Sequence, residues 1–415
     1  MMKGIVVWRT MERISHKIII TRYNKKIISI VYVNGKAYDI DTHILGEPLL
    51  NSIHVAKVKN ITPNIDAAFL DICVQKDNRG RNMKCFYSLN DNKSHLYLDK
   101  MPHSNLKEGD DILVQVIKES AKSKVPITSS HISLSGIYAV VSIGRGRIHF
   151  SSKIKDGEWK QEMSEALKEY LDADIDILLR TNAYNADKAL IINDIKTYKE
   201  KLGDIFEKAS YRTSPSFLYS SDKSYISMVK KYLNSGLMEI LTDIEPIYNE
   251  IRQFVEYHDS SYLPRIRFYN DLLQPLSKLY SIETLLSEVL TKKVWLKSGA
   301  YIVIEYTEGL TVIDVNTGKR SNKGSANENA KRTNIEAAIE IARQLRLRNI
   351  SGIVVVDFID MNTKQDQDEL FCIISDELKK DPLKAVAVDI TALNLVEITR
   401  QKIKKPLYEQ FMLDI

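Results

Sequence analysis

The sequence predicts an α+β protein of several domains, and three observations lead to that expectation. The chain has 415 residues, which is enough for two to four compact units. Short strands follow one another over residues 52–134, amphipathic helices dominate the middle, and the carboxy-terminal part alternates strand and helix. With 44% hydrophobic residues, the composition is that of a globular protein rather than a disordered one.

The charge and the cysteine content narrow the class of protein. The net charge of +5 is a mild basic excess, which suits an enzyme with a local basic groove but also many proteins that bind no nucleic acid. The three cysteines, Cys73, Cys85 and Cys372, form no CxxC pair, so neither a disulfide framework nor a structural zinc site is expected. No apolar run reaches the roughly 18 residues that span a bilayer, and the first residues do not read as a secretory signal.

The amino-terminal third is predicted to consist of strands. Residues 27–40 read as a hairpin, because Asn34-Gly35 supplies the two positive-φ positions of a tight turn. Five further strands are expected at SIHVAKV, AAFLDIC, KCFYSL, DILVQVI and PITSSHISL. Several short strands separated by polar turns predict a small β-barrel, of which the OB-fold is one form.

The middle of the chain is predicted to be helical. Two apolar stripes recur at helical spacing and are expected to pack into the core. They are Trp159, Met163, Ala166, Leu167, Tyr170 and Leu171 in the first helix, and Ile191, Ile195, Tyr198, Leu202 and Phe206 in the second. Between them, DIDILLRTNAYN reads as a buried strand that ends at Arg180-Thr181. Residues 222–242 and 246–258 predict two more helices.

The carboxy-terminal part predicts an α/β unit. YIVIEY and LTVIDV are strands around a turn at 307–309, and a loop rich in Gly, Ser, Asn and Lys follows over 317–329. A long helix then buries Ala330, Asn334, Ala337, Ile341 and Leu345 on one face and ends at 349–352. The continuous apolar run SGIVVVDFIDM is expected to be buried on both faces of a sheet. A helix near 364–380 and a strand at KAVAVDI complete the unit.

Two acidic residues follow apolar strands in this unit. Asp314 comes after LTVI and Asp357 after GIVVV, and ligands bind near the carboxyl ends of strands in open α/β sheets. We expect carboxylates there to lose hydration and a divalent cation to compensate, although each acid could instead cap a turn or a helix. Asn316 shares the face of Asp314 if the strand continues, with turn formation as the alternative.

Basic residues lie between the two acids along the chain, and they have two readings. They could contact phosphates, or they could form a solvated helix face. They are Lys319, Arg320, Lys323, Arg343, Arg346 and Arg348.

The stretch from TEGLTVIDVNTGKRSNKG through NIEAAIEIARQLRLRNISGIVVVDFIDM resembles the catalytic core of the ribonuclease E/G family. The likeness is nearly gapless over about 294–361, weaker on to NLVEITRQK and back to about residue 53, and poor in the first 45 residues. It implies an RNase H-like part at 1–46 and 219–288, interrupted by an OB-fold RNA-binding domain at 47–130 and a 5′-sensor subdomain at 131–218. A DNase-I-like α/β catalytic subdomain at 289–415 follows.

The resemblance also implies a Mg²⁺-dependent endoribonuclease. Asp314 and Asp357 would hold one Mg²⁺ per active site, with Asn316 in support, for in-line attack of water on the scissile phosphate. The products would carry a 5′-phosphate and a 3′-hydroxyl. The expected substrate is single-stranded, A/U-rich RNA with a stimulating 5′-monophosphate, in the processing and decay of messenger and ribosomal RNA. The base preference comes from the family alone.

By the same likeness, Phe69 and Phe86 stack RNA bases and Lys124 adds a basic contact on the OB-type domain. Stacking contributes roughly 1–3 kcal/mol per base. Core packing is the alternative for both phenylalanines, and the longer segment QKDNRGRNMK separates them here.

The family's 5′-sensor is carried over onto five positions. Gly136 and Val140 would hold the pocket through their backbones, and Arg180 and Thr181 would bind the terminal monophosphate. Lys384 stands where the family usually has an arginine. A lysine keeps the charge and loses the bidentate geometry, which weakens the sensor.

Zinc, oligomeric state and compartment are further expectations. Family members usually continue into a CPxC-type motif that shares a zinc between protomers, whereas this sequence ends at Ile415 without it. We therefore expect no structural zinc and no zinc-linked dimer, and the oligomeric state stays open. Frequent Lys, Asn, Ile and Tyr indicate an AT-rich coding genome, which favours a plastid stroma, with a bacterial cytoplasm as the alternative.

Two other functions remain as alternatives. One is a non-catalytic protein that binds single-stranded RNA on the same scaffold, which the presence of Asp314, Asn316 and Asp357 disfavours. The other is a DNA or phosphoester hydrolase with the same pair of acids, since OB-folds also bind single-stranded DNA.

Overall fold

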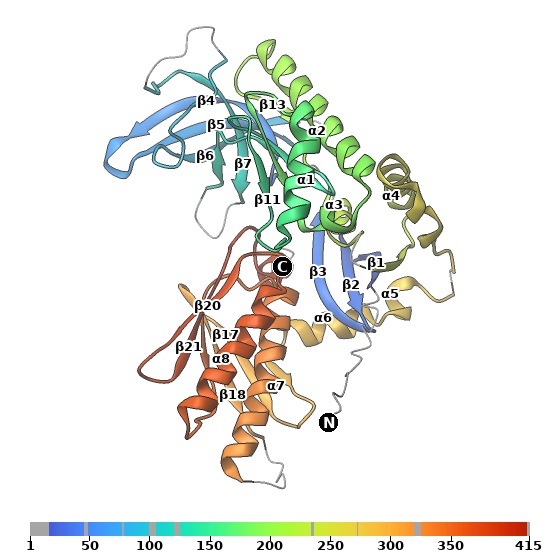
Figure 1. Ribbon diagram of the computed structural model, residues 1–415, viewed down its shortest axis with the longest axis vertical. Coiled ribbons are helices and arrows are strands. Elements are labelled where there is room, and N and C mark those ends of the chain that lie inside the picture. Colours follow the sequence, from blue (N-terminus) through green and yellow to red (C-terminus); the bar gives the residue numbers. More distant parts are fainter. Residues whose placement is uncertain are drawn as a thin grey trace, which may run out of the picture.

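The computed structural model describes residues 16–44, 49–76, 79–98, 105–119, 125–233, 236–271, 273–318 and 325–412. Within these ranges the chain is a mixed α/β protein whose strands form four sheets. Figure 1 shows two bodies: the first three sheets with helices α1 to α4 above, and the fourth sheet with α7 and α8 below. No helix in the described ranges is long and apolar enough to cross a membrane.

The first sheet joins distant parts of the chain, in the order β15-β14-β1-β2-β3. Its strands are β1 (His16–Tyr23), β2 (Lys26–Val33), β3 (Lys36–Ile44), β14 (Leu237–Thr242) and β15 (Ile266–Phe268). β1, β2 and β3 form an antiparallel meander, whereas β14 pairs with β1 in parallel. The predicted hairpin is confirmed, because Asn34 and Gly35 connect β2 to β3 with φ values of 49° and 77°.

Helices and one 3₁₀ turn follow or border the first sheet. They are α3 (Ser224–Tyr232), α4 (Glu245–His258), η4 (Ser260–Arg265), α5 (Leu276–Leu279) and α6 (Ile282–Leu290). The expected helix at 246–258 is confirmed by α4, but a helix over the whole of 222–242 is wrong. α3 ends at Tyr232, Gly236 has φ 87°, and 237–242 forms β14. Pairing with β1 buries Leu237, Ile240 and Leu241, and this tertiary contact overrides the local helical pattern.

The second sheet is a closed barrel. Its members are β4 (Ile53–Thr62), β5 (Ala67–Lys76), β6 (Arg79–Ser88), β7 (Asp111–Lys118) and β8 (Ile127–Ser129), with the 3₁₀ turn η1 (Pro63–Ile65) between β4 and β5. The order β4-β5-β6-β8-β7 closes because β4 also pairs with β7, and β13 (Ser216–Tyr219) adds to β4. The expected five-stranded, OB-like barrel is therefore confirmed. The single strand expected at PITSSHISL is wrong, because only β8 belongs to the barrel and residues 133–135 form a strand of the third sheet.

The third sheet has the order β11-β12-β10-β9 and is packed by two helices. Its strands are β9 (Ser133–Ser135), β10 (Ala139–Ile143), β11 (Ile148–Phe150) and β12 (Ile175–Leu179). Its helical elements are α1 (Gly157–Leu167), η2 (Lys168–Tyr170), η3 (Thr181–Asn185) and α2 (Lys188–Ser210). Asp156 and Asp187 cap α1 and α2 by accepting backbone N–H groups, and the apolar stripes predicted for both helices pack into the core.

The fourth sheet has the order β16-β17-β18-β19-β21-β20. Its strands are β16 (Lys293–Trp295), β17 (Tyr301–Tyr306), β18 (Leu310–Asn316), β19 (Gly352–Asp357), β20 (Ala385–Ile390) and β21 (Leu395–Arg400). Its helices are α7 (Ala326–Leu347), α8 (Lys364–Lys379) and α9 (Leu407–Met412). Ser325 and Glu328 form a capping box at the start of α7, so the predicted loop over 317–329 stops earlier than expected.

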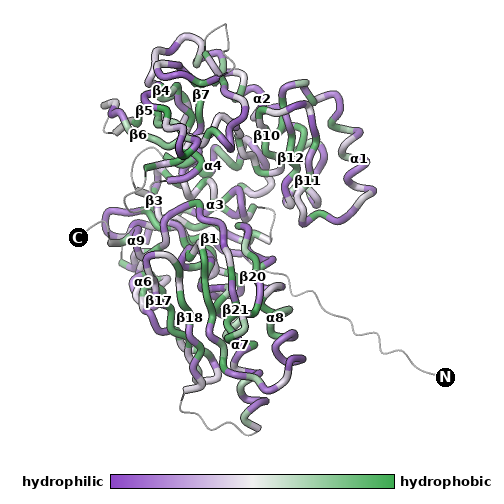
Figure 2. The backbone as a smooth tube through the Cα atoms, turned by 90° about the vertical axis from the view of Figure 1, so that its left-hand side faces the viewer, coloured by the Kyte–Doolittle hydropathy of each residue, from purple (hydrophilic) through white to green (hydrophobic). Residues whose placement is uncertain are grey.

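Both long helices cover the same face of the fourth sheet (Figure 1). Ile313 and Val315 of β18 and Val354 and Val356 of β19 are buried beneath them. Figure 2 shows the resulting alternation as changes between green and purple along the strands. The expectation that SGIVVVDFIDM is buried on both faces is wrong, since Ile353 is 52% exposed. The opposite face of the sheet has no such cover within the described ranges.

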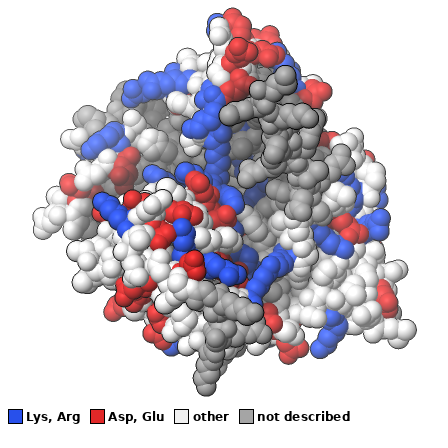
Figure 3. Space-filling view, turned by 60° about the horizontal axis from the view of Figure 1, so that its bottom comes forward, with Lys and Arg blue, Asp and Glu red and all other residues white. Residues whose placement is uncertain are grey.

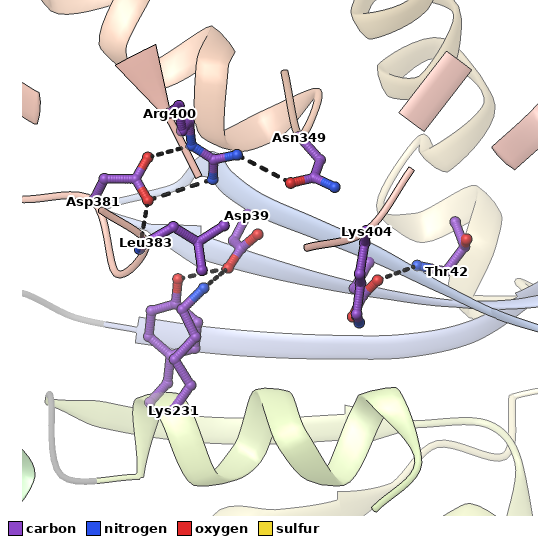
Figure 4. A network of polar contacts seen from close by, with 10 residues as sticks. Asp39, Thr42, Lys231, Asn349, Asp381, Leu383, Arg400 and Lys404 are labelled. Atoms are coloured by element: carbon purple, nitrogen blue, oxygen red, sulfur yellow. Dashed lines mark hydrogen bonds and ion pairs between the residues drawn. The ribbon is translucent and has the colours of Figure 1, made fainter. Parts of the chain in front are cut away.

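A polar network joins β3 to the carboxy-terminal segment (Figure 4). Lys404 forms an ion pair with Asp41 at 2.6 Å, and Arg343 of α7 donates to the backbone oxygen of Ala37 at 2.6 Å. Arg400 and Asp381 form a fully buried ion pair, with 2.9 Å between Nε and Oδ2. A cavity of about 170 Å³ lies among these groups. The two bodies therefore meet through these paired charges and also through an apolar cluster, in which Ile28 and Ile30 of the first sheet pack with Leu347 of α7 and Leu407 of α9.

Replacing Asp381 by Asn should destabilise the protein. Arg400 would stay buried without its counter-ion, and breaking a buried pair costs about 3–5 kcal/mol. Urea unfolding followed by circular dichroism measures the change. Asp376→Asn is the matched control, because the Asp376–Lys379 pair is exposed and its loss should leave the midpoint unchanged. Equal effects of the two substitutions would contradict the structural role of the buried pair.

Candidate active site

The two acidic residues lie opposite each other in the fourth sheet. β18 and β19 are parallel neighbours, and their register pairs Asp314 with Asp357. Adjacent strands are about 4.8 Å apart and paired residues share one face, so the two carboxylates project side by side. Asp357 is the last residue of β19, whereas β18 continues for two residues beyond Asp314.

This pair lies on the uncovered face of the sheet. Val312 and Asp314 of β18 are exposed, while their neighbours Thr311 and Ile313 are buried. The expected loss of hydration at the acids is therefore wrong, because α7 and α8 cover only the other face. Two adjacent carboxylates repel each other instead, and a divalent ion bound between them would relieve that repulsion.

Asn316 shares the face of Asp314. Since β18 includes Asn316, the two side chains point the same way, and Asn316 Nδ2 donates to Asp314 Oδ2 at 2.7 Å. The amide thereby fixes one carboxylate oxygen and leaves its own oxygen to accept a hydrogen bond or to bind a cation.

The donor set is small and consists of hard oxygen atoms. In the described part of the chain, no three or more His, Cys, Asp or Glu residues gather as metal ligands. Two carboxylates with an amide fit Mg²⁺, which keeps several waters and takes one or two carboxylates from the protein. They do not fit a cage of the kind that binds zinc or calcium.

The basic residues between the acids divide into two groups. Lys319, Arg320 and Lys323 lie outside the described residues. Arg346 and Arg348 are buried at the end of α7, and Arg343 is half-buried against Glu340. Arg343 and Arg346 contact Ala37 and Tyr38 of β3, whereas Arg348 donates to the backbone oxygen of Thr291. The expectation of a solvated helix face is therefore wrong for these three residues. Figure 3 shows acidic and basic side chains interspersed on the lower face of the molecule rather than separated by sign.

The barrel places two aromatic residues together. Phe69 of β5 and Phe86 of β6 are register partners, with ring centroids 6.0 Å apart in an edge-to-face arrangement. Both are half-buried, and Lys84 Nζ lies 5.0 Å from the centre of the Phe69 ring. The sequence pointed to the two phenylalanines but not to Lys84. Lys124 lies outside the described residues.

The third sheet and its loops hold four of the five residues expected in the 5′-sensor, which are Gly136, Val140, Arg180 and Thr181. Arg180 Nη1 donates to the backbone oxygens of Gly136 and Ile137, and Thr181 shares a hydrogen bond with Ser151 at 2.9 Å. Val140 of β10 lies between its partners on β9 and β12. Burial lowers the pKa of Arg180, an effect that the Asp194 carboxylate opposes.

Asp194 is a residue that the sequence reasoning missed. It is buried on α2 and accepts hydrogen bonds from the backbone N–H groups of Tyr138 and Ala139 at 2.8 and 3.1 Å. Burial raises its pKa, and these hydrogen bonds act in the opposite direction. The signal was an acid on the apolar helical stripe of Ile191, Ile195 and Tyr198. Asp194 therefore fixes the loop that carries Gly136.

Lys384 is exposed on the loop between α8 and β20. The neighbouring Asp381 accepts a hydrogen bond at its backbone oxygen from Lys153 Nζ, at 3.0 Å. Lys153 follows Ser151, the partner of Thr181. These contacts bring the loop of Lys384 against the segment that follows β11, on the side where Thr181 lies.

Comparison with known proteins gives consistent matches. The model of the Ribonuclease E/G family matches residues 133–403. The chain is 31% identical over 370 residues to a ribonuclease E of Nostoc sp., covering 88% of this chain and 53% of the relative. It is 32% identical over 367 residues to a ribonuclease E/G-like protein of Pyropia yezoensis, covering 87% and 70%. It is 26% identical over 399 residues to the ribonuclease G of Escherichia coli, covering 91% and 78%. The chain thus spans about half the length of the Nostoc relative.

Gly136→Ala should disturb the loop that Asp194 holds. A Cβ atom at this position would lie 2.2 Å from Asp194 Oδ2, so the loop must move, and overpacking of this kind costs about 1–3 kcal/mol. Gly203→Ala in α2 is the control, because its Cβ meets nothing within 4 Å and the helix should gain stability. Thermal unfolding of both variants measures the difference. A neutral Gly136→Ala would contradict the tight packing of the loop.

Proposed function

Because the chain belongs to the ribonuclease E/G family, we propose that it is an endoribonuclease that cuts single-stranded RNA at the Asp314–Asp357 pair. The observation that carries the proposal is the parallel register that sets the two carboxylates side by side on an uncovered face. A single-stranded phosphodiester can reach this face without any helix moving, whereas the opposite face is filled by α7 and α8.

In this proposal Asp314 and Asp357 hold Mg²⁺. When bound, the ion supplies charge neutralisation at the phosphate and lowers the pKa of coordinated water. Asn316 orients the Asp314 carboxylate through its hydrogen bond and adds an amide oxygen next to the reacting phosphate. Both acids are exposed to solvent. The bound RNA itself must therefore shield the ion from water.

The barrel supplies a second contact in the proposal. Phe69 and Phe86 offer half-buried rings to bases, and Lys84 stands beside them to meet a phosphate. Lys124 would add to this surface. The two rings also pack against each other edge to face, so each is partly buried. A base must therefore stack on the exposed part of each ring.

We further propose that the loop of Gly136 and Val140, with Arg180, Thr181 and Lys384, recognises a 5′-monophosphate. A guanidinium group that is pinned to the backbone at Gly136 is pre-organised for an anion, and a hydroxyl at Thr181 adds a donor. We assign no residue of this chain to a preference for A/U-rich RNA, and that part of the proposal rests on the family alone.

The four sheets support the proposed division into an RNase H-like part (1–46 and 219–288), an OB-type domain (47–130), a sensor (131–218) and a DNase-I-like subdomain (289–415). β13 departs from it slightly, since residues 216–219 pair with the barrel. We place the activity in a plastid stroma, with a bacterial cytoplasm as the alternative. Relatives from Pyropia yezoensis and from Nostoc sp. support both.

Asp314→Asn and Asp357→Asn should each reduce cleavage by roughly 100-fold or more, because each loses one of two negative ligands of the cation. The assay is cleavage of a 5′-monophosphorylated single-stranded RNA with Mg²⁺. RNA affinity should persist in both variants. Asp389→Asn, at an exposed carboxylate of β20 in the same sheet, should cut normally. Wild-type rates in both site variants would remove the assignment, and binding without cleavage by the native chain would favour the non-catalytic alternative.

The sensor predicts faster cleavage of 5′-monophosphorylated than of 5′-triphosphorylated RNA. Arg180→Ala should abolish this difference in rate. Arg145→Ala, at an exposed arginine in the turn between β10 and β11, should keep it. Lys384→Arg should enlarge it, since a guanidinium restores bidentate contact. Initial rates on both RNAs measure the ratio. If the native chain cleaves both RNAs at equal rates and Arg180→Ala changes neither rate, the sensor is refuted. The assignment of Asp314 and Asp357 would be unaffected by that result.

A further inference from the structure

A compact group of two aromatic residues and a lysine lies at the free edge of the fourth sheet. Trp295 of β16 is 63% exposed, and its ring centroid is 5.2 Å from that of Tyr301 on β17, at an interplanar angle of 62°. Lys293 Nζ lies 4.0 Å from the Trp295 centroid and 3.6 Å from the Tyr301 centroid. The ammonium group thus lies close to both rings. We call these three residues the edge platform.

Strand register places the edge platform next to the acid pair. Trp295 pairs with Tyr301, and Tyr301 pairs with Asn316, so these three form one row across β16, β17 and β18. The next row starts at Lys293 and reaches Asp314 and Asp357 through Val303.

All of these side chains therefore share the uncovered face of the sheet. Two strand spacings and two residue steps put the Trp295 and Asp314 Cα atoms roughly 12 Å apart. A strand of RNA cut at the acids can therefore reach the platform.

Ordinary structural roles explain only part of this arrangement. A lysine protects an edge strand from unwanted pairing, and an aromatic cross-strand pair stabilises a short strand such as β16. Neither role requires a large indole to remain mostly exposed on the face of the sheet. Aromatic faces combined with a cation are what a flexible, single-stranded nucleic acid recognises, because every base has a π-face and every linkage carries a charge.

Resting on the proposed function, we propose that the edge platform is a base-stacking subsite of the substrate RNA. Trp295 and Tyr301 hold a base near the scissile linkage, and Lys293 meets the adjoining phosphate. The subsite sets which linkage comes to rest at Asp314 and Asp357. It depends on stacking and charge, so it tolerates any base and favours purines, which offer the larger surface.

The test measures binding and not cleavage, in full-length protein with Asp314→Asn as the background. A short, fluorescently labelled single-stranded RNA is titrated with magnesium present. Adding Trp295→Ala should weaken the affinity about 5- to 100-fold. Trp295→Phe should recover most of it, and Lys293→Gln should lower the slope of log affinity against log salt by about one. Leu393→Ala, at a 79% exposed apolar side chain of the same body, is the matched control and should not change the affinity.

The outcomes separate this subsite from the proposed function. Unchanged affinity in Trp295→Ala and Tyr301→Ala, with circular dichroism showing a folded chain, overturns the subsite even if Asp314→Asn abolishes cleavage. If Trp295→Ala instead changes the oligomeric state in size-exclusion chromatography, and affinity per chain stays constant, the platform is a contact between copies of this chain and the proposal fails. In cleavage assays with Asp314 intact, the subsite further requires Trp295→Ala to raise KM more than it lowers kcat.

Discussion

The parallel register of β18 and β19 is the constraint on which the candidate site depends. It aligns Asp314 with Asp357, and because α7 and α8 both cover the other face, the two like charges meet solvent together. Neighbouring carboxylates repel each other, so the arrangement is stable only with water, a cation or a hydrogen-bond donor nearby. Asn316 supplies the donor for one of them. The remaining charge is what a divalent ion would neutralise, and the same ion would then face a phosphodiester.

The other three sheets are built from an interrupted stretch of chain. The barrel and the third sheet are inserted between β3 and β14 of the first sheet, so the chain leaves that sheet and returns to it about 190 residues later. The first sheet then meets the fourth-sheet body through ion pairs such as Lys404–Asp41 and through the apolar cluster that contains Leu347. Asp194 fixes the loop at Gly136 in a similar way, by accepting backbone N–H groups inside the core.

Local sequence patterns predicted those elements whose conformation depends mainly on neighbouring residues in the chain. The sequence predicted the Asn34-Gly35 turn, the barrel, the helix of Ala337 and Ile341, and the strands that carry the two acids. Two errors came from contacts that are distant in sequence. The local pattern of residues 237–242 predicts a helix, but pairing with β1 makes them a strand. The apolar run SGIVVVD predicts burial on both faces, but α7 and α8 cover only one face of the sheet. Asp194 and Lys84 act through partners on other elements, and the edge platform appears only when β16, β17 and β18 are aligned.

Magnesium binding tests the central claim most directly. Isothermal titration of the full chain with Mg²⁺, or with Mn²⁺ as its substitute, should give one ion per chain. That binding should be lost when Asp314 and Asp357 are both replaced by Asn, and should persist in Asp389→Asn. An unchanged stoichiometry in the double variant would show that the ion sits elsewhere, and the in-register carboxylates would then need another explanation.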